Sequence, residues 1–339
     1  ASHMSQTTPF VLQQYFYNLN AQPYLDFEMP WWNQSFKEQI TLEGKNYMAA
    51  GDISQTMLRG TYVTILNKAV LNEYHPGYNV YDTVRSGAWT YDEFLHLADI
   101  YHDVNGDGKA DVSDIYGFIR DAVGIVNDAL VGSFDIPLVE NEGDTLKIVF
   151  NSEKTIAAVQ MLADMAKNGE LSGYNSGDIP MTDGFGTGRY IFLLEGPWKT
   201  AELAGAYPDM AYGNCQLPAG EAGSISVLGG EDIAMFNGSH KDAAWKFMQF
   251  MTSPFAEEEM AKCGQIPVNK TALESETVKN ASFAPFLEAI TTAKARPAVA
   301  SWSEIDNELT TAMTKILVNG ADVKETLDAL AVTIDGLLA

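Results

Sequence analysis

Hydrophobic residues recur at helical spacing in several stretches of the chain. A serine or asparagine at 151–152 can cap the first stretch, whose apolar positions fall on one helical face: Ile156, Val159, Leu162, Ala163 and Ala166. Thr90 and Glu93 form a capping box before a second stretch. Two more helices are predicted at the end of the chain, one from 301 to a glycine stop at 320 and one opening at 322–325.

Short apolar runs that favour strands lie between these predicted helices. They cover residues 62–66, 190–194 and 233–236. Strands and helices alternate along the chain, and no Pro/Gly/Ser-rich linker divides it. The sequence therefore predicts an α/β protein. If it has two lobes, the chain must cross between them on ordered strands.

Length and charge narrow the possible partners. The 339 residues exceed one ordinary core and suit two lobes. Lys and Arg number 21 against 45 Asp and Glu, a net charge of -24 that repels phosphate backbones and anionic lipid headgroups. Nucleic acid and bare membrane are therefore poor partners, and no apolar run approaches the roughly 18 residues of a membrane span. The first four residues, Ala-Ser-His-Met, are typical of a cloning scar.

One segment matches the pattern of a calcium-binding loop. Oxygen-bearing side chains stand at the first, third and fifth positions of residues 103–114, and a glycine follows for the sharp turn. The expected Ca²⁺ ligands are Asp103, Asn105, Asp107, the Lys109 carbonyl and Asp114. Asp114 is shorter than the usual glutamate at that position. A structural calcium site and an Asn/Asp/Gly turn that is stable without metal are both open.

Signatures of catalysis and nucleotide binding are missing from the sequence. The glycine-rich run at 184–188 precedes a strand instead of opening a helix, which disfavours a phosphate cradle. Cys215 and Cys263 form no CxxC pair, the histidines look scattered, and neither GxSxG nor HExxH occurs. A glycosidase needs only two carboxylates, which this acidic chain could supply anywhere. A secreted carbohydrate-active hydrolase therefore stays open as the alternative function.

Tryptophans and nearby carboxylates indicate a sugar site. Trp198 follows Gly-Pro at the end of a predicted buried strand, Trp302 precedes a predicted helix, and Trp32 lies in a loop segment. Sugar rings stack their C–H faces on indole, and their hydroxyls need carboxylate or amide partners, for which Glu231 and Asp232 are candidates. Each tryptophan alone is more typical of a core, as Trp89 and Trp245 are predicted to be. Together they favour carbohydrate binding.

Several segments, spread in a specific order over roughly residues 10 to 339, match a known family. Among them are PYLDFEMPWWN at 23–33, GDIS at 51–54, EGPW at 195–198, LGGED at 228–232 and QIPVN at 265–269. In these segments the chain resembles the family 1 extracellular solute-binding proteins, which include the maltose-binding protein, and especially lipoproteins of Gram-positive gut bacteria.

This resemblance implies a two-lobed periplasmic-binding-protein-like fold of type II, with ligand in a cleft that closes by hinge motion. It implies an extracellular protein, lipid-anchored at full length, that passes a sugar to ABC transporter permease subunits. In relatives, tryptophans matching Trp198 and Trp302 stack on sugar. The segments around 61–67 and 226–232 would be hinge crossings, which places Glu231 and Asp232 at the cleft. Asp52 and Trp32, from the same matching segments, complete the predicted ligand site.

The chain departs from the family pattern at its start, where about a hundred residues of the family are not represented. Lobe I is predicted from 10–62 and 228–285, and lobe II from 66–226 and 286–339. A truncated lobe I would leave apolar surface and an open sheet edge. We therefore expect either a small, rearranged lobe I or self-association that covers it. The predicted function is carbohydrate capture for an ABC importer, by a protein that is not an enzyme.

Overall fold

A computed structural model describes two compact units. It describes most of 62–109, 113–119, 139–167, 181–262 and 301–338, together with shorter stretches between 2 and 48, 133–136, 275–276 and 294–295. Unit 1 comprises Ala1–Thr61 and Val227–Ser303, and unit 2 comprises Tyr62–Ser226 and Glu304–Ala339. The chain thus passes between the units three times. Its last passage falls at 303/304, whereas the predicted lobe boundary stood near 286.

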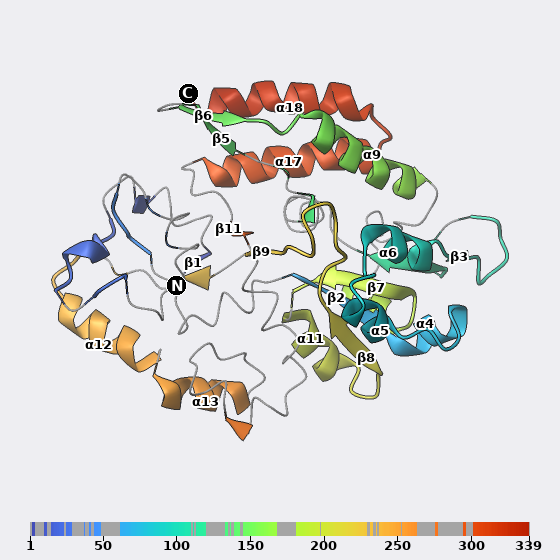
Figure 1. Ribbon diagram of the computed structural model, residues 1–339, viewed down its shortest axis with the longest axis horizontal. Coiled ribbons are helices and arrows are strands. Elements are labelled where there is room, and N and C mark those ends of the chain that lie inside the picture. Colours follow the sequence, from blue (N-terminus) through green and yellow to red (C-terminus); the bar gives the residue numbers. More distant parts are fainter. Residues whose placement is uncertain are drawn as a thin grey trace. The chain divides into compact units, whose positions relative to one another are not determined.

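Unit 2 is built on a five-stranded mixed sheet (Figure 1). In spatial order the strands are β3 (Tyr101–His102), β4 (Ile115–Ile119), β7 (Tyr190–Glu195), β2 (Val63–Asn67) and β8 (Tyr212–Cys215). β4 runs parallel to β7, and β2 runs antiparallel to both β7 and β8. The carboxyl ends of β4, β7 and β8 therefore meet the amino end of β2 at one edge of the sheet. The α/β class is confirmed, as are the strands predicted at 62–66 and 190–194.

Aromatic side chains fill the core beside this sheet. The central residue is Phe94, whose ring centroid lies 5.0 Å from that of Phe118 and 5.2 Å from that of Phe192. Trp89 is 1% exposed, and its indole N–H donates to the Gln216 carbonyl at 3.0 Å. Trp89 is thus a core residue, as predicted, with its one polar atom satisfied.

Short helices surround the sheet of unit 2: α4 (Lys68–Tyr74), α5 (Val80–Arg85), α6 (Tyr91–Ala98), α10 (Met181–Gly186) and α11 (Trp198–Ala206). At α6 the Thr90 hydroxyl accepts the Glu93 N–H at 3.3 Å, as the capping box predicts. The Glu93 carboxylate does not complete the box, because it accepts the Tyr78 hydroxyl instead.

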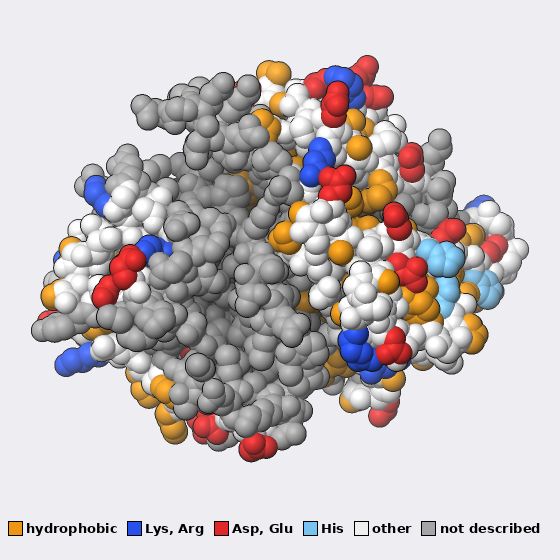
Figure 2. Space-filling view, viewed as in Figure 1, with side chains coloured by type: hydrophobic (Ala, Val, Ile, Leu, Met, Phe, Trp, Pro, Cys, Tyr) orange, Lys and Arg blue, Asp and Glu red, His pale blue; other side chains and the backbone are white. Residues whose placement is uncertain are grey.

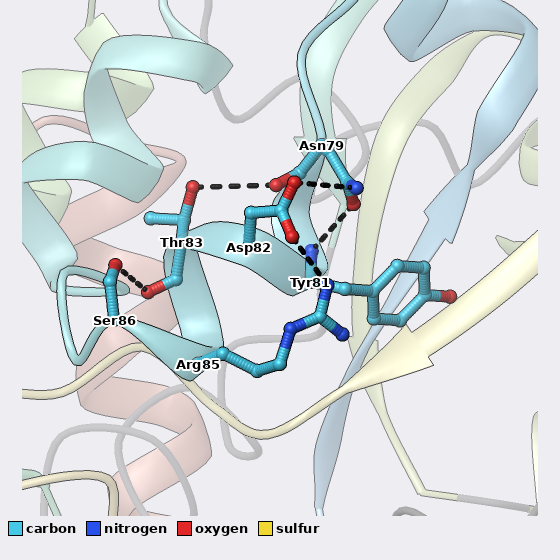
Figure 3. Close-up of polar contacts among 6 residues, drawn as sticks. All are labelled: Asn79, Tyr81, Asp82, Thr83, Arg85 and Ser86. Carbon is cyan, nitrogen blue, oxygen red and sulfur yellow. Dashed lines mark hydrogen bonds and ion pairs between the residues drawn. The ribbon is translucent and has the colours of Figure 1, made fainter.

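The start of α5 shows how local sequence fixes a helix end (Figure 3). The Asn79 side-chain oxygen accepts the Tyr81 N–H at 3.1 Å, and its amide donates to Asp82 at 2.9 Å. Arg85 pairs with the same Asp82 carboxylate one turn later. Asp82 in the first turn and Arg85 in the last also complement the helix dipole.

Among its described residues, unit 2 also holds three longer helices and a hairpin. They are α9 (Glu153–Lys167), α17 (Trp302–Leu317, whose first two residues belong to unit 1), α18 (Val323–Leu338) and the antiparallel pair β5 (Val139–Glu142) and β6 (Thr145–Ile148). α18 contacts both α9 and β6. The predicted caps are present: the Ser152 hydroxyl accepts Thr155 N–H at 3.2 Å, and Asp322 accepts Glu325 N–H at 2.9 Å. Gly320 follows α17 with φ 67°, a conformation suited to glycine.

The strands of unit 1 among its described residues are short and form pairs. β1 (Ser2–His3) pairs antiparallel with β10 (Glu231–Asp232), and β9 (Val227–Leu228) pairs parallel with β11 (Lys294–Ala295). A short 3-10 helix, η1, covers Leu19–Ala21. The strand predicted at 233–236 lies outside the described residues except for Met235.

Two further helices of unit 1, α12 (Lys241–Met251) and α13 (Pro254–Lys262), expose large apolar side chains. No residue of α12 is buried, so Trp245, predicted as core, is only half-buried. Phe247, Phe250 and Phe255 are 59%, 55% and 66% exposed. The helical periodicity around Trp245 predicted a packed face, but these three phenylalanines are each more than half exposed.

Candidate ligand site

The edge of unit 2 where the strand ends meet carries the strongest candidate site. Ligands of α/β sheets bind outside the carboxyl ends of the strands. Glu195 ends β7 at this edge, and Gly196 and Trp198 follow it directly. The chain also enters unit 2 here at Tyr62 and leaves it at Ser226, whose hydroxyl accepts the Tyr62 backbone N–H at 2.8 Å.

Among the predicted ligand residues, Trp198 is the one that lies at this edge of the sheet, just after the end of β7. The sequence suggested that Trp198 lies in a loop, but it is the first residue of α11, and it is half-buried. Its ring meets Tyr62 edge-on, with 5.4 Å between centroids and 87° between planes. A half-buried indole at the ligand edge of a sheet can present one face to a flat, C–H-rich surface such as a sugar ring.

Glu195 places a carboxylate next to this indole. It is 5% exposed, and its Oε2 accepts the Gly196 N–H at 3.0 Å. Strand pairing sets Glu195 opposite Val63. Glu195 therefore holds the turn that leads from β7 into α11 and brings a carboxyl group to the same edge.

Trp302, the second predicted stacking residue, is buried. It begins α17 and is 1% exposed. Its indole N–H is buried and has no hydrogen-bond partner among the residues that the structure describes. An unsatisfied buried donor is costly, so this N–H is available to an acceptor that enters its surroundings. Stacking of Trp302 on a ligand stays a prediction.

The other predicted ligand residues are less fully described. Glu231 and Asp232 form β10, and their backbone pairs with residues 3 and 2. Asp52 and Trp32 lie outside the described residues. That the six predicted ligand residues form one site therefore stays a prediction, and Trp198 is the one whose surroundings are described in most detail.

The predicted calcium loop is organised by its own hydrogen bonds. The Asp103 carboxylate accepts the N–H groups of Gly106 and Gly108 at 2.6 and 2.7 Å. Asn105 accepts the Asp107 N–H at 2.9 Å, and Asp107 accepts the Lys109 N–H at 2.8 Å. These contacts turn the side chains of Asp103, Asn105 and Asp107 toward the loop backbone, and both carboxylate oxygens of Asp103 accept a backbone N–H.

Asp114 anchors the end of this loop. It is 0% exposed and accepts the Val104 N–H at 3.1 Å, the Tyr101 hydroxyl at 3.0 Å and the Asp111 N–H at 3.0 Å. Desolvation and this bond to Asp114 raise the pKa of Tyr101 to about 12. Among the described residues, no three His, Cys, Asp or Glu side chains gather as a metal site. Calcium binding stays a prediction.

The glycine-rich run at 184–188 overlaps the end of α10, and N–H groups at its end donate to carbonyls of the same segment. Thr187, Gly188 and Arg189 donate to the carbonyls of residues 183, 185 and 184 at 2.9, 3.1 and 3.1 Å. A phosphate cradle needs free N–H groups that point at the ligand. This run instead closes α10 and leads into β7.

Three histidines that looked scattered in the sequence gather on one side of unit 2 (Figure 2). The rings of His75 and His96 lie 6.5 Å apart, and His102 Nδ1 bonds the Tyr74 hydroxyl at 2.7 Å. His75 Nε2 bonds the Leu97 carbonyl at 2.9 Å. Sequence spacing could not reveal this group, because separate elements of unit 2 bring it together.

A model of the bacterial extracellular solute-binding protein family matches residues 4–285. The chain belongs to this family. Solved sugar-binding proteins share its fold: MalE of Xanthomonas citri has a TM-score of 0.76 at 17% identity, covering 99% of this chain and 82% of that one. The maltose-bound MalE3 of T. maritima has a TM-score of 0.75 at 19% identity, with 99% and 83% covered. The predicted family and fold are thus confirmed.

Curated relatives match this solute-binding protein over part of their length. A binding protein of Brucella abortus (strain 2308) is 28% identical over 161 residues, which are 45% of this chain and 38% of the relative. The diacetylchitobiose binding protein DasA of Streptomyces coelicolor is 24% identical over 289 residues, 82% of this chain and 62% of the relative. The chain therefore matches less than two thirds of either relative. None of its described helices is long and apolar enough to cross a membrane.

Sequence reasoning missed Tyr62 and Ser226 as members of the candidate site of this solute-binding protein. Both residues lie in segments that the family resemblance implies as hinge crossings, 61–67 and 226–232, but nothing in the sequence indicated that they meet each other beside Trp198. They lie 164 positions apart in the sequence. Only the position of β2 beside β7 brings Tyr62 against the Trp198 ring.

Proposed function

We propose that this chain captures a carbohydrate outside the cell and delivers it to the permease of an ABC importer, without chemical turnover. The observation that carries the proposal is the half-buried Trp198 indole at the ligand edge of the unit 2 sheet, beside the Tyr62 ring. Membership of the extracellular solute-binding family and the fold shared with sugar-binding proteins support it.

The chemistry of the site matches a sugar better than an anion. An indole face offers dispersion and C–H contacts to a pyranose ring, and carboxylates accept its hydroxyl protons. Glu195 supplies one buried carboxylate at this edge. We propose Trp302, Glu231, Asp232, Asp52 and Trp32 as further ligand contacts. The net charge of -24 disfavours a phosphorylated ligand.

A thermal-shift titration tests the proposal. Maltose, maltotetraose and diacetylchitobiose are added in turn, and a bound sugar raises the melting temperature as RT ln(1 + [L]/Kd). Trp198→Ala is expected to lose about 1–3 kcal/mol of sugar affinity with the fold retained, as for a stacking anchor. Trp245→Ala, which removes a half-buried tryptophan of α12, is the matched control. Equal affinities for Trp198→Ala and the wild type would contradict the site assignment.

The alternative of a carbohydrate-active hydrolase has its own test. The same sugars are incubated with the protein, and newly released reducing ends are measured over time. We expect none above the level in a buffer control. Release that scales with protein concentration would replace the binding function with a hydrolytic one.

A further inference from the structure

We infer that Gly196 and Tyr62 are positioning residues that hold the Trp198 indole in one orientation before any ligand arrives. The inference rests on the proposed function, since Trp198 is its stacking residue. Gly196 and Tyr62 contact the indole from two sides, and we call these two residues the walls of the Trp198 seat. One wall lies on the β7–α11 connection and the other at the start of β2.

Gly196 forms the first wall because only a residue without a side chain fits there. A Cβ built on Gly196 would lie well inside 3.0 Å of three atoms of the Trp198 six-membered ring, Cζ3, Cη2 and Cε3. Real Cβ atoms essentially never come so close. The requirement for glycine is therefore spatial, because the indole folds back over its Cα.

The Gly196 peptide cannot easily turn away from the ring. Its N–H donates to the Glu195 carboxylate at 3.0 Å, and its carbonyl accepts the Lys199 N–H at 3.0 Å. A side chain added at this position would therefore move the indole before it moved the backbone.

Tyr62 forms the second wall. Its ring meets the indole edge-on at 5.4 Å and 87°, a favourable arrangement for two aromatic rings. Register sets Val63 opposite Glu195 as the last pair of the ladder, and Tyr62 and Gly196 are the residues directly beyond this pair. Its N–H is bonded to the Ser226 hydroxyl at 2.8 Å, and Tyr62 itself is 9% exposed. The second wall is thus fixed by sheet pairing and by a side-chain bond from the other chain crossing.

A fixed indole favours binding because the ligand does not have to order it. Immobilising a rotamer-rich side chain on binding lowers affinity by about twofold to tenfold. Loss of either wall should therefore weaken sugar binding by about that factor while Trp198 itself is still present.

The experiment reports the ring position separately from ligand binding. The protein is labelled with 5-fluorotryptophan, and ¹⁹F NMR resolves its six tryptophans. Trp198→Phe identifies the resonance of Trp198. Gly196→Ala and Tyr62→Leu are expected to shift or broaden this resonance, and Tyr62→Phe, which restores the ring, to bring it back. Gly205→Ala is the matched control, because a Cβ at Gly205, also in α11, meets nothing within 4 Å.

The same variants are titrated with maltose and diacetylchitobiose by calorimetry. We expect Gly196→Ala and Tyr62→Leu to bind about twofold to tenfold more weakly, with the Gly205→Ala control unchanged. An unmoved Trp198 resonance in both seat variants, or a moved resonance with unchanged affinity, overturns the positioning role. If the wild type binds neither sugar, the proposed carbohydrate function fails, while the resonance alone still decides whether the Trp198 seat exists. Because Tyr62→Leu leaves Gly196 intact, a folding failure of Gly196→Ala does not remove the test.

Discussion

Asp114 offers a sharp test of how the 103–114 loop is held. Its buried carboxylate accepts the Val104 and Asp111 N–H groups and the Tyr101 hydroxyl, all between 3.0 and 3.1 Å. We predict that Asp114→Ala strongly destabilises unit 2 even when no metal is present. The carboxylate joins the start of the loop to its end, so its removal frees both at once.

The magnitude follows from these three bonds. Hydrogen bonds to a charged group contribute about 1.5–3 kcal/mol each, and donors in an exposed loop recover part of this from water, so we expect a net loss of roughly 3–5 kcal/mol. At about 2–4 °C per kcal/mol for a unit of about 150–250 residues, the melting temperature should fall by roughly 6–20 °C.

Circular dichroism melts in EDTA measure this effect without any contribution from calcium. Asp107→Ala is the matched control, because Asp107 accepts the N–H of Lys109 in an exposed part of the same loop. Its melting temperature should fall by no more than about 4 °C, the equivalent of about 1 kcal/mol. If Asp114→Ala melts as the control does, the carboxylate is not the anchor and our reading of the loop is wrong.

Four further predictions concern metal, pH, thiol chemistry and assembly. If the loop binds calcium, saturation at about 100 times Kd stabilises the wild type by about 2.7 kcal/mol, and Asp107→Ala loses this gain; no gain in the wild type identifies a metal-independent turn. A hydrogen bond from Lys324 lowers the pKa of Asp328, so this contact stabilises the fold above the unfolded carboxyl's pKa of about 3.9 and is lost as pH falls through the folded value. Acid melts of Asp328→Asn should lack this component, and an unchanged acid melt would contradict it. Burial raises the pKa of Cys215 to about 12, so peptide mapping after thiol labelling should find it unmodified in the native protein and modified in denaturant; native labelling would show that the thiol is accessible. We expect a second copy of the chain to cover the exposed face of α12 and α13, so light scattering should give a dimer that Phe255→Asp dissociates, and a monomeric wild type would refute this.

The features that local sequence controls were predictable. The runs at 62–66 and 190–194 are apolar except for Thr64, because β2 and β7 are interior strands buried on both faces. The caps at Thr90, Ser152 and Asp322 were visible because a cap depends on residues only three positions apart. In each case the sequence signal lies within one helical turn or one strand.

The features that depend on distant partners were not predictable. Trp302 and Trp245 both stand at helical positions with suitable flanks, yet the first is 1% exposed and the second is half-buried. The sequence predicted Trp245 as the core residue and Trp302 as the residue that faces a ligand. Periodicity shows which face of a helix is apolar, but it does not show whether another element covers that face. The proximity of His75 and His96 was not predictable for the same reason, since the end of α4 and α6 come together only in the folded unit.

The Trp198 seat shows why a binding site can depend on residues that no binding motif contains. Trp198, the proposed stacking residue, belongs to a recognisable Gly-Pro-Trp segment, but we infer that its orientation depends on Tyr62, at the entry of the chain into unit 2. Tyr62 is in turn bonded to Ser226, at the exit of the chain. Trp198 therefore contacts Tyr62 at one chain crossing, and through Tyr62 it is linked by a hydrogen bond to Ser226 at another crossing. If ligand binding moves one unit relative to the other, these contacts would link Trp198 to the motion. Within unit 2, the proposed stacking residue and these two chain crossings thus lie at the same edge of the sheet.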